Sequence, residues 1–379
     1  MSRLLAILVV VGAGLPFVIS VAGTAIVRTW ACRRGFVDRP GGHKAHAAPV
    51  ALGGGIAIFA AIVLPLAAAL LFSRIGAGRL PAEVLGYTFH VGGHTARVAD
   101  LLGGVAMRLP AGLAILGGAI VLHILGLIDD VRPLGPGIKM LVMAAVALTL
   151  TAGFGVRALD VLGSVPSVLL TTLWIVLIMN AFNFMDNMDG LSAGVAAIAA
   201  IFFAAAAMLA GQVFVPALGL ILAGAVLGFL VHNFPPARIF MGDSGSLVVG
   251  YVMAVLTVLT NYYNPDLQRR PFGVLAPLLV LAVPLYDVAS VVMIRLRDGV
   301  SPFRGDRRHF SHRLVRRGMQ TRSAVLTIYL ATAATGCSSL LLPLVSWPFA
   351  VLIGAQCFCV VLIVAILEST GAAGSPGNS

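Results

Sequence analysis

Acidic residues are scarce in this chain, where only 14 of 379 residues are Asp or Glu and 10% carry a charge of either sign. Hydrophobic residues make up 59% of the sequence, and the mean hydropathy is +1.02. So few charges cannot cover the surface of a soluble protein of this length, which excludes that class. The composition predicts a polytopic membrane protein.

Cysteines are also few, and the four present show no paired spacing that would indicate a metal site. A long polar interval is missing as well: the largest, at 73–109, contains its own apolar stretch at 98–106. We therefore expect no separate soluble domain. The predicted organisation is one transmembrane domain over 1–367, followed by a flexible cytoplasmic tail over 368–379.

Apolar windows recur along the whole chain. A transmembrane helix needs about 20 mostly apolar residues, and eleven windows meet that need. They cover residues 4–27, 51–72, 110–128, 138–156, 163–181, 191–210, 213–232, 245–261, 273–294, 323–343 and 347–367. The pattern predicts an all-α bundle of about 11 transmembrane helices, with 10 as the alternative. A cleaved signal peptide is the other interpretation of the first window, but the basic residues that follow it favour a span.

Basic residues are concentrated on one side of these windows. Five segments on that side hold 17 of the 25 Lys and Arg residues, namely 28–50, 129–139, 182–190, 233–244 and 295–322. The positive-inside rule makes this side cytoplasmic, with the N-terminus outside, the C-terminus inside and the protein in the inner (plasma) membrane. The net charge of +11 thus reflects topology and contact with anionic lipid. Scattered basic loops of this kind exclude a nucleic-acid partner.

Five of the 14 acids lie at the ends of apolar windows on the predicted cytoplasmic side. They are Asp129, Asp130, Asp186, Asp189 and Asp243. A carboxylate in such a place is costly unless it meets a cation, a proton donor or water. Five together predict a polar active site at the cytoplasmic face.

Two of the acidic segments suggest how a cation is held. Asp129 and Asp130 are adjacent and repel each other, so either Mg²⁺ or Lys139 with Arg132 is needed nearby. In the segment 180–190, polar residues recur every third position and share a face if the segment is helical. These are Asn180, Asn183, Asp186 and Asp189. Amide and carboxylate oxygens are the ligands that hard cations prefer.

Three further segments contribute glycines and cations. Gly242 and Gly245 flank Asp243 and leave its carboxylate accessible. The basic segment 38–55 carries Lys44 and His46 and ends in glycines that allow either close approach to a ligand or tight helix packing. In the Arg-rich segment, cationic side chains are spaced to grip one anion: His309, His312 and Arg313. Carboxylates for a metal beside cations for phosphate predict phosphoryl transfer.

The segments DDVRPLGPGIK, NAFNFMDNMDGL, NFPPARIFMGDSGSL and DRRHFSHRL together resemble the polyprenyl-phosphate N-acetylhexosamine-1-phosphate transferase family, glycosyltransferase family 4. The likeness extends over about residues 25–320 in order and spacing. It implies an Mg²⁺-dependent enzyme, with Mn²⁺ as the alternative. Such an enzyme transfers a sugar 1-phosphate from a UDP-sugar to a polyprenyl phosphate and releases UMP.

The resemblance also implies roles for individual residues. It assigns Asp129, Asp130 and Asp243 to catalysis, and Asn183 with Asp243 to the metal. The substrate-binding set is Lys44, His46, Lys139, Asn180, Asp186, Asp189, His309, His312 and Arg313. Direct attack by the lipid phosphate is the preferred route, and an aspartyl-phosphate intermediate is the alternative.

Several alternatives stay open at the level of sequence. The HxxHR pattern favours N-acetylglucosamine 1-phosphate as the group transferred, with phospho-N-acetylmuramoyl-pentapeptide transfer as the alternative, because Ser311 and His43 depart from the common pattern. An ion-coupled transporter would place acids deep within several helices, and only Asp287 lies so. We expect Asp287 to be a structural or lipid-groove residue, or to pair with an amide of the fifth window. A homodimer is left open.

Overall fold

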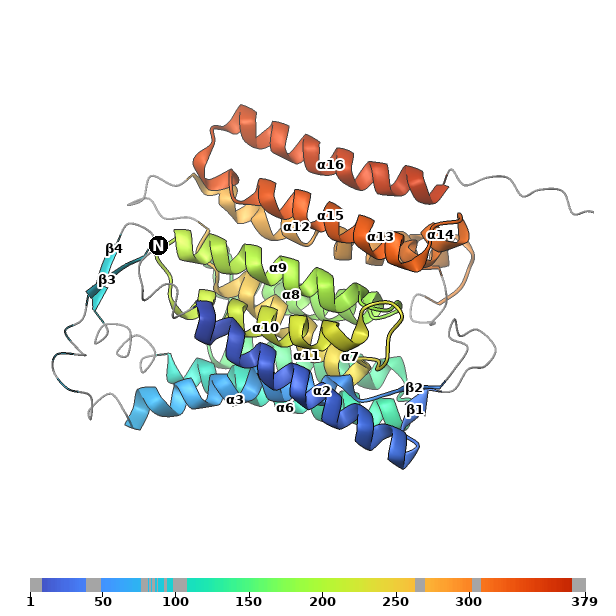
Figure 1. Ribbon diagram of the computed structural model, residues 1–379. Coiled ribbons are helices and arrows are strands. Elements are labelled where there is room, and N and C mark those ends of the chain that lie inside the picture. The colour runs from blue at the N-terminus through green and yellow to red at the C-terminus, as the bar shows by residue number, and fades with distance from the viewer. Residues whose placement is uncertain are drawn as a thin grey trace, which may run out of the picture.

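The structure is a computed structural model that describes residues 9–38, 49–75, 81, 83, 86, 88–91, 94–97, 108–262, 270–301 and 308–369. Helices dominate it and lie side by side in one bundle (Figure 1). In chain order the long helices are α2 (Leu15–Arg34), α3 (Gly54–Ile75), α6 (Leu109–Val131), α7 (Pro136–Leu148), α8 (Ser164–Met185), α9 (Leu191–Leu209), α10 (Phe214–Asn233), α11 (Asp243–Leu259), α13 (Ala282–Arg297), α15 (Thr321–Ser339) and α16 (Trp347–Ser369).

Shorter elements complete the bundle. The π-helical turns η1 and η3 extend α2 and α7, and two short helices flank α13. Their bounds are η1 (Val10–Gly14), η3 (Thr149–Gly153), η4 (Asp160–Leu162), η6 (Pro271–Leu275), α12 (Ala276–Val280), α14 (Phe310–Arg316) and η7 (Leu342–Leu344). The strands β1 (Val37–Asp38) and β2 (Val50–Ala51) form one antiparallel pair, and β3 (Thr88–Val91) and β4 (His94–Arg97) form another.

The predicted all-α membrane fold is confirmed. In the described part of the chain every predicted window falls on helical segments, and nine helices are long and apolar enough to span a membrane. The window at 245–261 is the shorter apolar helix α11. The window at 273–294 is not one straight span, because α12 and α13 meet at 61°. Pro284 explains this break, since it has no N–H to donate to the carbonyl of Val280, where α12 ends.

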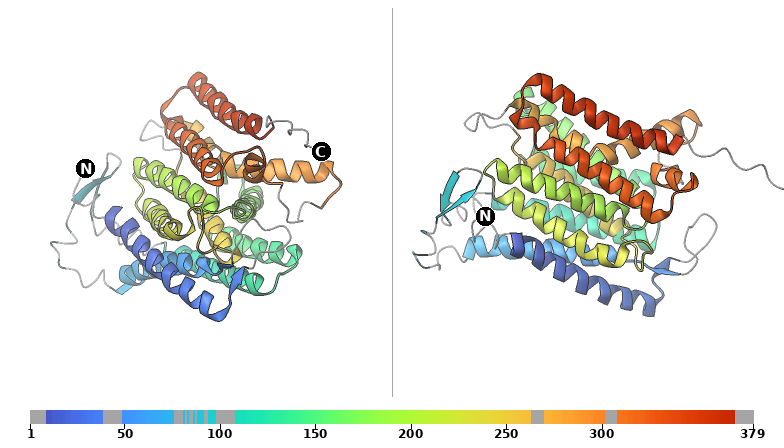
Figure 2. Two further views of the ribbon diagram at one scale, coloured as in Figure 1. Left: turned by 45° about the vertical axis from the view of Figure 1, so that its right-hand side comes forward. Right: turned by 45° about the horizontal axis from the view of Figure 1, so that its top comes forward.

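The two ends of the bundle differ. The pair β1–β2 and helix α14 lie at one end, and the pair β3–β4 lies at the other (Figure 1). Figure 2 shows α15 and α16 on one side of the bundle and α2 and α3 on the opposite side. We refer to the end that carries β1, β2 and α14 as the α14 end.

Helix α11 is the centre of the packing. It contacts α3, α6, α8, α9 and α10, and all residues from Ser244 to Thr257 are buried. A 17-residue helix enclosed in this way does not need the length of a lipid-facing span. Its first residue is Asp243, so the buried helix fixes the position of that acid.

Glycines bring neighbouring backbones close to the start of α11. A Cβ on Gly55 would lie 2.3 Å from the Gly245 nitrogen, and one on Gly54 would lie 2.8 Å from the Phe240 oxygen. The Gly54 and Gly55 N–H groups donate to the carbonyls of Phe240 and Met241 at 2.9 Å. Of the two roles considered for these glycines, the structure supports tight packing. The start of α3 is thereby joined to the segment that leads to Asp243.

We predict that Gly126→Ala destabilises the protein, because the new Cβ would lie 2.3 Å from the Ser244 nitrogen. Overpacking against backbone costs about 1–3 kcal/mol or more. Gly117→Ala in the same helix is the matched control, since no atom lies within 4 Å of its Cβ position. Thermal unfolding of the detergent-purified variants measures the difference. Equal melting temperatures for the two variants would contradict this packing.

Candidate active site

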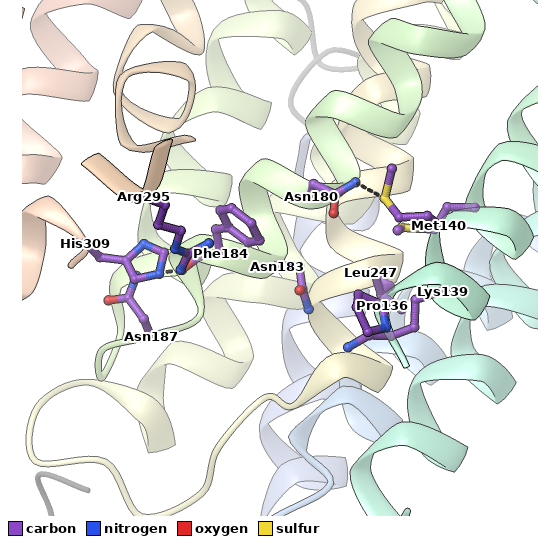
Figure 3. A pocket seen from close by; sticks show the side chains of 11 residues that line it. Pro136, Lys139, Met140, Asn180, Asn183, Phe184, Asn187, Leu247, Arg295 and His309 are labelled. Carbon is purple, nitrogen blue, oxygen red and sulfur yellow. Dashed lines mark hydrogen bonds between the residues drawn. The ribbon is translucent and has the colours of Figure 1, made fainter. Parts of the chain in front are cut away.

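A cavity of about 320 Å³ opens between α7, α8, α11, α13 and the start of α14. Figure 3 shows the side chains that line it, with Arg295 and His309 on one side, Lys139 on the other and Asn183 between them. Among the described residues its lining is Pro136, Lys139, Met140, Met143, Asn180, Asn183, Phe184, Asn187, Leu247, Arg295 and His309. Apolar side chains and three asparagines thus lie between two ends that carry basic residues.

Lys139 joins two acids that lie far apart in the sequence. Its Nζ donates to Asp129 Oδ2 at 3.1 Å and to Asp243 Oδ2 at 2.8 Å. Asp129 Oδ1 accepts a bond from the Leu134 N–H at 2.7 Å. Lys139 lies in the first turn of α7 and Asp129 in the last turn of α6. The dipole of its own helix disfavours each of these charges. Their mutual attraction offsets that cost, and the expected pairing of Lys139 with the acidic pair is confirmed for Asp129.

Asp130 has a different environment from its neighbour. Its two oxygens accept bonds from the N–H groups of Asp243 at 2.8 Å and Ser244 at 3.2 Å. A carboxylate at the N-terminus of α11 is favoured by the helix dipole. Gly242 has a φ of +72°, and a Cβ there would lie 2.7 Å from the Asp130 oxygens. Asp130 therefore fixes the position of the backbone at Asp243 and Ser244.

Asn183 completes the surroundings of Asp243. Its Nδ2 donates to Asp243 Oδ1 and to Ser246 Oγ, both at 3.0 Å. The Asp243 carboxylate thus has an amide on one oxygen and an ammonium on the other. Asn180 also lines the cavity, and its Nδ2 donates to the Val176 carbonyl at 2.8 Å.

The segment after Met185 is a turn, which corrects the single helical face expected for the four polar residues. Helix α8 ends at Met185, where the Asn187 Nδ2 donates to the Phe184 carbonyl at 2.6 Å. Side-chain amides of this kind compete with helical bonding and favour turns. Asp189 lies in the turn, where its Oδ2 accepts a bond from the Ala237 N–H at 2.8 Å. Only Asn180 and Asn183 remain on the helix.

Asp186 lies beside the other acids. Burial raises the pKa of Asp186 well above its usual value, and the nearby Asp243 and Asp130 carboxylates raise it further. In the described residues no group of three or more His, Cys, Asp or Glu side chains forms a metal site by itself. Magnesium commonly takes one or two carboxylates and completes its shell with substrate phosphates and water. The crowded acids fit that mode of binding.

At the other end of the cavity, His309 is held by a buried acid. Its Nδ1 lies 2.8 Å from Asp287 Oδ2, and the Phe310 N–H donates to Asp287 Oδ1 at 3.2 Å. Asp287 is fully buried. The prediction that Asp287 pairs with an amide of the fifth window is wrong, because His309 and Phe310 at the start of α14 occupy its carboxylate. The Asp287 carboxylate thus fixes the orientation of the His309 ring.

Arg295 is a site residue that sequence reasoning missed. It is 1% exposed, lines the cavity, and places its guanidinium carbon 5.4 Å from the centre of the Phe184 ring. Its sequence context was an ordinary basic loop, although its position in the last turn of an apolar helix was a signal. His123, which lies inside the apolar window at 110–128, was also missed. It stacks on Phe59 and lies 3.0 Å from the Ser244 carbonyl, beside Asp243.

The remaining predicted residues lie elsewhere. Lys44 and His46 are outside the described residues. His312 and Arg313 are on α14 but do not line the cavity. Arg313 instead forms an ion pair with Glu368, at 3.0 Å between Nη2 and Oε1. Helix α16 runs to Ser369, so Glu368 belongs to the helix and not to the expected tail.

Comparison with known proteins links this geometry to a family. The profile described as glycosyl transferase family 4 matches residues 112–261. A probable undecaprenyl-phosphate N-acetylglucosaminyl 1-phosphate transferase of Bacillus subtilis (strain 168) is 32% identical over 318 residues, covering 81% of this chain and 77% of the relative.

Two further relatives have closely related names. A decaprenyl-phosphate N-acetylglucosaminephosphotransferase of Mycobacterium tuberculosis (strain CDC 1551 / Oshkosh) is 34% identical over 357 residues, with 84% of this chain and 81% of the relative covered. An undecaprenyl-phosphate alpha-N-acetylglucosaminyl 1-phosphate transferase of Escherichia coli (strain K12) is 28% identical over 316 residues, covering 79% and 74%. These comparisons agree with the resemblance seen in the motifs.

We predict that Asp130→Asn lowers the stability of the protein. An asparagine keeps one acceptor oxygen, so one of the two backbone N–H groups loses its acceptor and faces an amide N–H group, at a cost of about 1–2 kcal/mol. Asp298→Asn is the control, because Asp298 is 50% exposed and its pair with Arg308 should be worth less than about 1 kcal/mol. Thermal unfolding in detergent compares the two. A melting temperature for Asp130→Asn at or above that of the control would rule out the capping role.

Proposed function

The chain belongs to glycosyl transferase family 4, and on that premise we propose that it transfers N-acetylglucosamine 1-phosphate from UDP-N-acetylglucosamine to undecaprenyl phosphate. The products would be UMP and a lipid-linked diphospho-sugar. One observation carries the proposal: Asp129 and Asp243 meet at Lys139 beside a cavity whose other end holds Arg295 and His309.

The charges around the cavity suit a diphosphate substrate. Lys139, Arg295 and His309 can balance the negative charge of the donor and of the acceptor phosphate. Asp243, Asp186 and Asn183 are the residues that would hold Mg²⁺, or Mn²⁺ as the alternative. When bound, the ion would add positive charge at the diphosphate.

We assign different tasks to the adjacent acids. Both Asp130 oxygens are engaged by backbone N–H groups, so we assign Asp130 to positioning Asp243. Asp129 has only one oxygen on a backbone N–H, and its other oxygen meets the Lys139 side chain, so it is the better candidate to take a proton from the lipid phosphate. A phosphate oxygen of the acceptor then bonds to the sugar-bearing phosphorus, and the bond to the UMP oxygen breaks. An aspartyl-phosphate intermediate remains the alternative.

The α14 end is proposed to face the cytoplasm, because most of the basic segments belong to it. The acceptor would enter from the bilayer and the donor from the aqueous side. The alternative donor, a UDP-N-acetylmuramoyl-pentapeptide, is less favoured because the relatives reported above carry N-acetylglucosamine in their names.

We predict that Asp243→Asn abolishes UMP release while the protein stays folded. The change removes the charge shared by Lys139 and the metal site with little change in volume. Purified protein is incubated with Mg²⁺, undecaprenyl phosphate and a panel of UDP-sugars, and UMP is measured. The wild type should release UMP with UDP-N-acetylglucosamine, and chelation of the metal should stop it. Release by the variant at the wild-type rate would remove Asp243 from the mechanism.

For Arg295→Gln we predict a rise in donor KM and a loss of about 10- to 100-fold in kcat/KM, since a hydrogen bond to a charged group is worth about 1.5–3 kcal/mol. Arg297→Gln in the same helix is the matched control, because Arg297 is exposed and outside the cavity lining. Initial rates at varied donor concentration give the donor KM and the kcat/KM of both variants. Equal kinetics for both variants would show that Arg295 does not meet the donor.

A further inference from the structure

Helix α16 places an acid against the arginine of the HxxHR motif. We infer that Glu368, at the α14 end of α16, is a positioning residue that acts through Arg313 to hold α14, and with it His309, at the cavity. On this view Arg313 stabilises the site and does not bind substrate. The inference relies on the proposed function only for the activity by which it is tested.

The contacts of Glu368 form a small, largely buried network. The Arg313 Nε donates to Glu368 Oε2 at 3.1 Å, and its Nη2 lies 3.0 Å from Oε1, which is a two-pronged pair. Tyr286 donates its hydroxyl to the same carboxylate at 2.6 Å. The Arg317 Nε donates to the Glu368 carbonyl at 3.2 Å. The Arg313 and Glu368 side chains are only 15% and 10% exposed.

Arg313 is also held from α13. Its Nη2 donates to Ser290 Oγ at 2.9 Å. A two-pronged bond between a guanidinium and a carboxylate is among the stronger side-chain contacts, and it fixes the orientation of both groups. A substrate phosphate would have to displace Glu368 to bind this arginine in the same way. Arg313 does not line the cavity, whereas Arg295 does.

Helix α14 needs such support. It has seven residues, and a helix of that length is not stable by itself. Its N-terminal end is held by Asp287, which accepts bonds from His309 and Phe310. Arg313 lies one turn further along, and Glu368 holds it there. The two acids thus hold α14 from α13 and from α16, and His309 faces the cavity as a result.

The experiment compares Glu368→Gln, Arg313→Gln, the double variant and the charge-exchanged pair Arg313→Glu with Glu368→Arg. Each is assayed for UMP release at varied UDP-N-acetylglucosamine. We expect either single change to lower kcat by about tenfold or more, as misplaced catalytic groups do. Donor KM should change little, and the double variant should be no slower than the singles. The exchanged pair should recover most of the lost kcat.

Asp298→Asn is the matched control, because it removes an acid from a half-exposed pair with Arg308 on the same end of the molecule. It should keep wild-type kinetics. Wild-type kcat in Glu368→Gln, together with a raised donor KM in Arg313→Gln, would overturn the inference and make Arg313 a substrate ligand.

A second measurement does not depend on activity. Trypsin cleavage after Arg316, the last residue of α14, is followed by mass spectrometry on protein in lipid nanodiscs. Release of α14 should speed this cleavage in Glu368→Gln but not in Asp298→Asn. Equal rates would contradict the inference. If the wild type releases no UMP, the proposed function fails, and the cleavage rates still decide whether Glu368 holds α14.

Discussion

The site depends on one ammonium group, Lys139 Nζ, which lies between the carboxylates of Asp129 and Asp243. Without it, two acids at the ends of apolar helices would repel each other where water is scarce. With it, the end of α6 and the start of α11 are both hydrogen-bonded to the start of α7 through the Lys139 side chain. Mutual neutralisation makes these charges tolerable at the edge of a membrane bundle, and the same arrangement leaves cationic groups able to meet phosphate.

The same residues serve packing and chemistry. Asp130 fixes the backbone of Asp243. Gly126, Gly55 and Gly242 let neighbouring segments of the protein approach that backbone closely. Asn233 is buried and joins two motif segments, because its Oδ1 accepts from Gly190 N–H and its Nδ2 donates to the Ile239 carbonyl, both at 2.9 Å. Substitutions here therefore affect folding together with function, and controls in the same helices are needed to separate the two.

Much of the fold and part of the site follow from the sequence. The apolar windows of the sequence coincide with the long helices of the described residues. The scarcity of acids indicated that Asp129, Asp130 and Asp243 belong to one group. Sequence periodicity could not show the break before Pro284, which follows from its missing N–H, or the turn after Met185, where a side-chain bond of Asn187 competes with the helix. The contacts of His309, Arg313 and Arg295 also escaped prediction. They pair residues between helices that are distant in the chain, and such pairs leave no periodic signal.

The central claim is that a single lysine gathers these acids into one site. The most direct test is an experimental structure of the ligand-free protein in a lipid nanodisc, in which the distances from Lys139 Nζ to the two carboxylates are measured. The account predicts hydrogen-bonding distance to both Asp129 and Asp243, as at 3.1 and 2.8 Å here. Carboxylates that face separate crevices, with Lys139 beside neither, would contradict it.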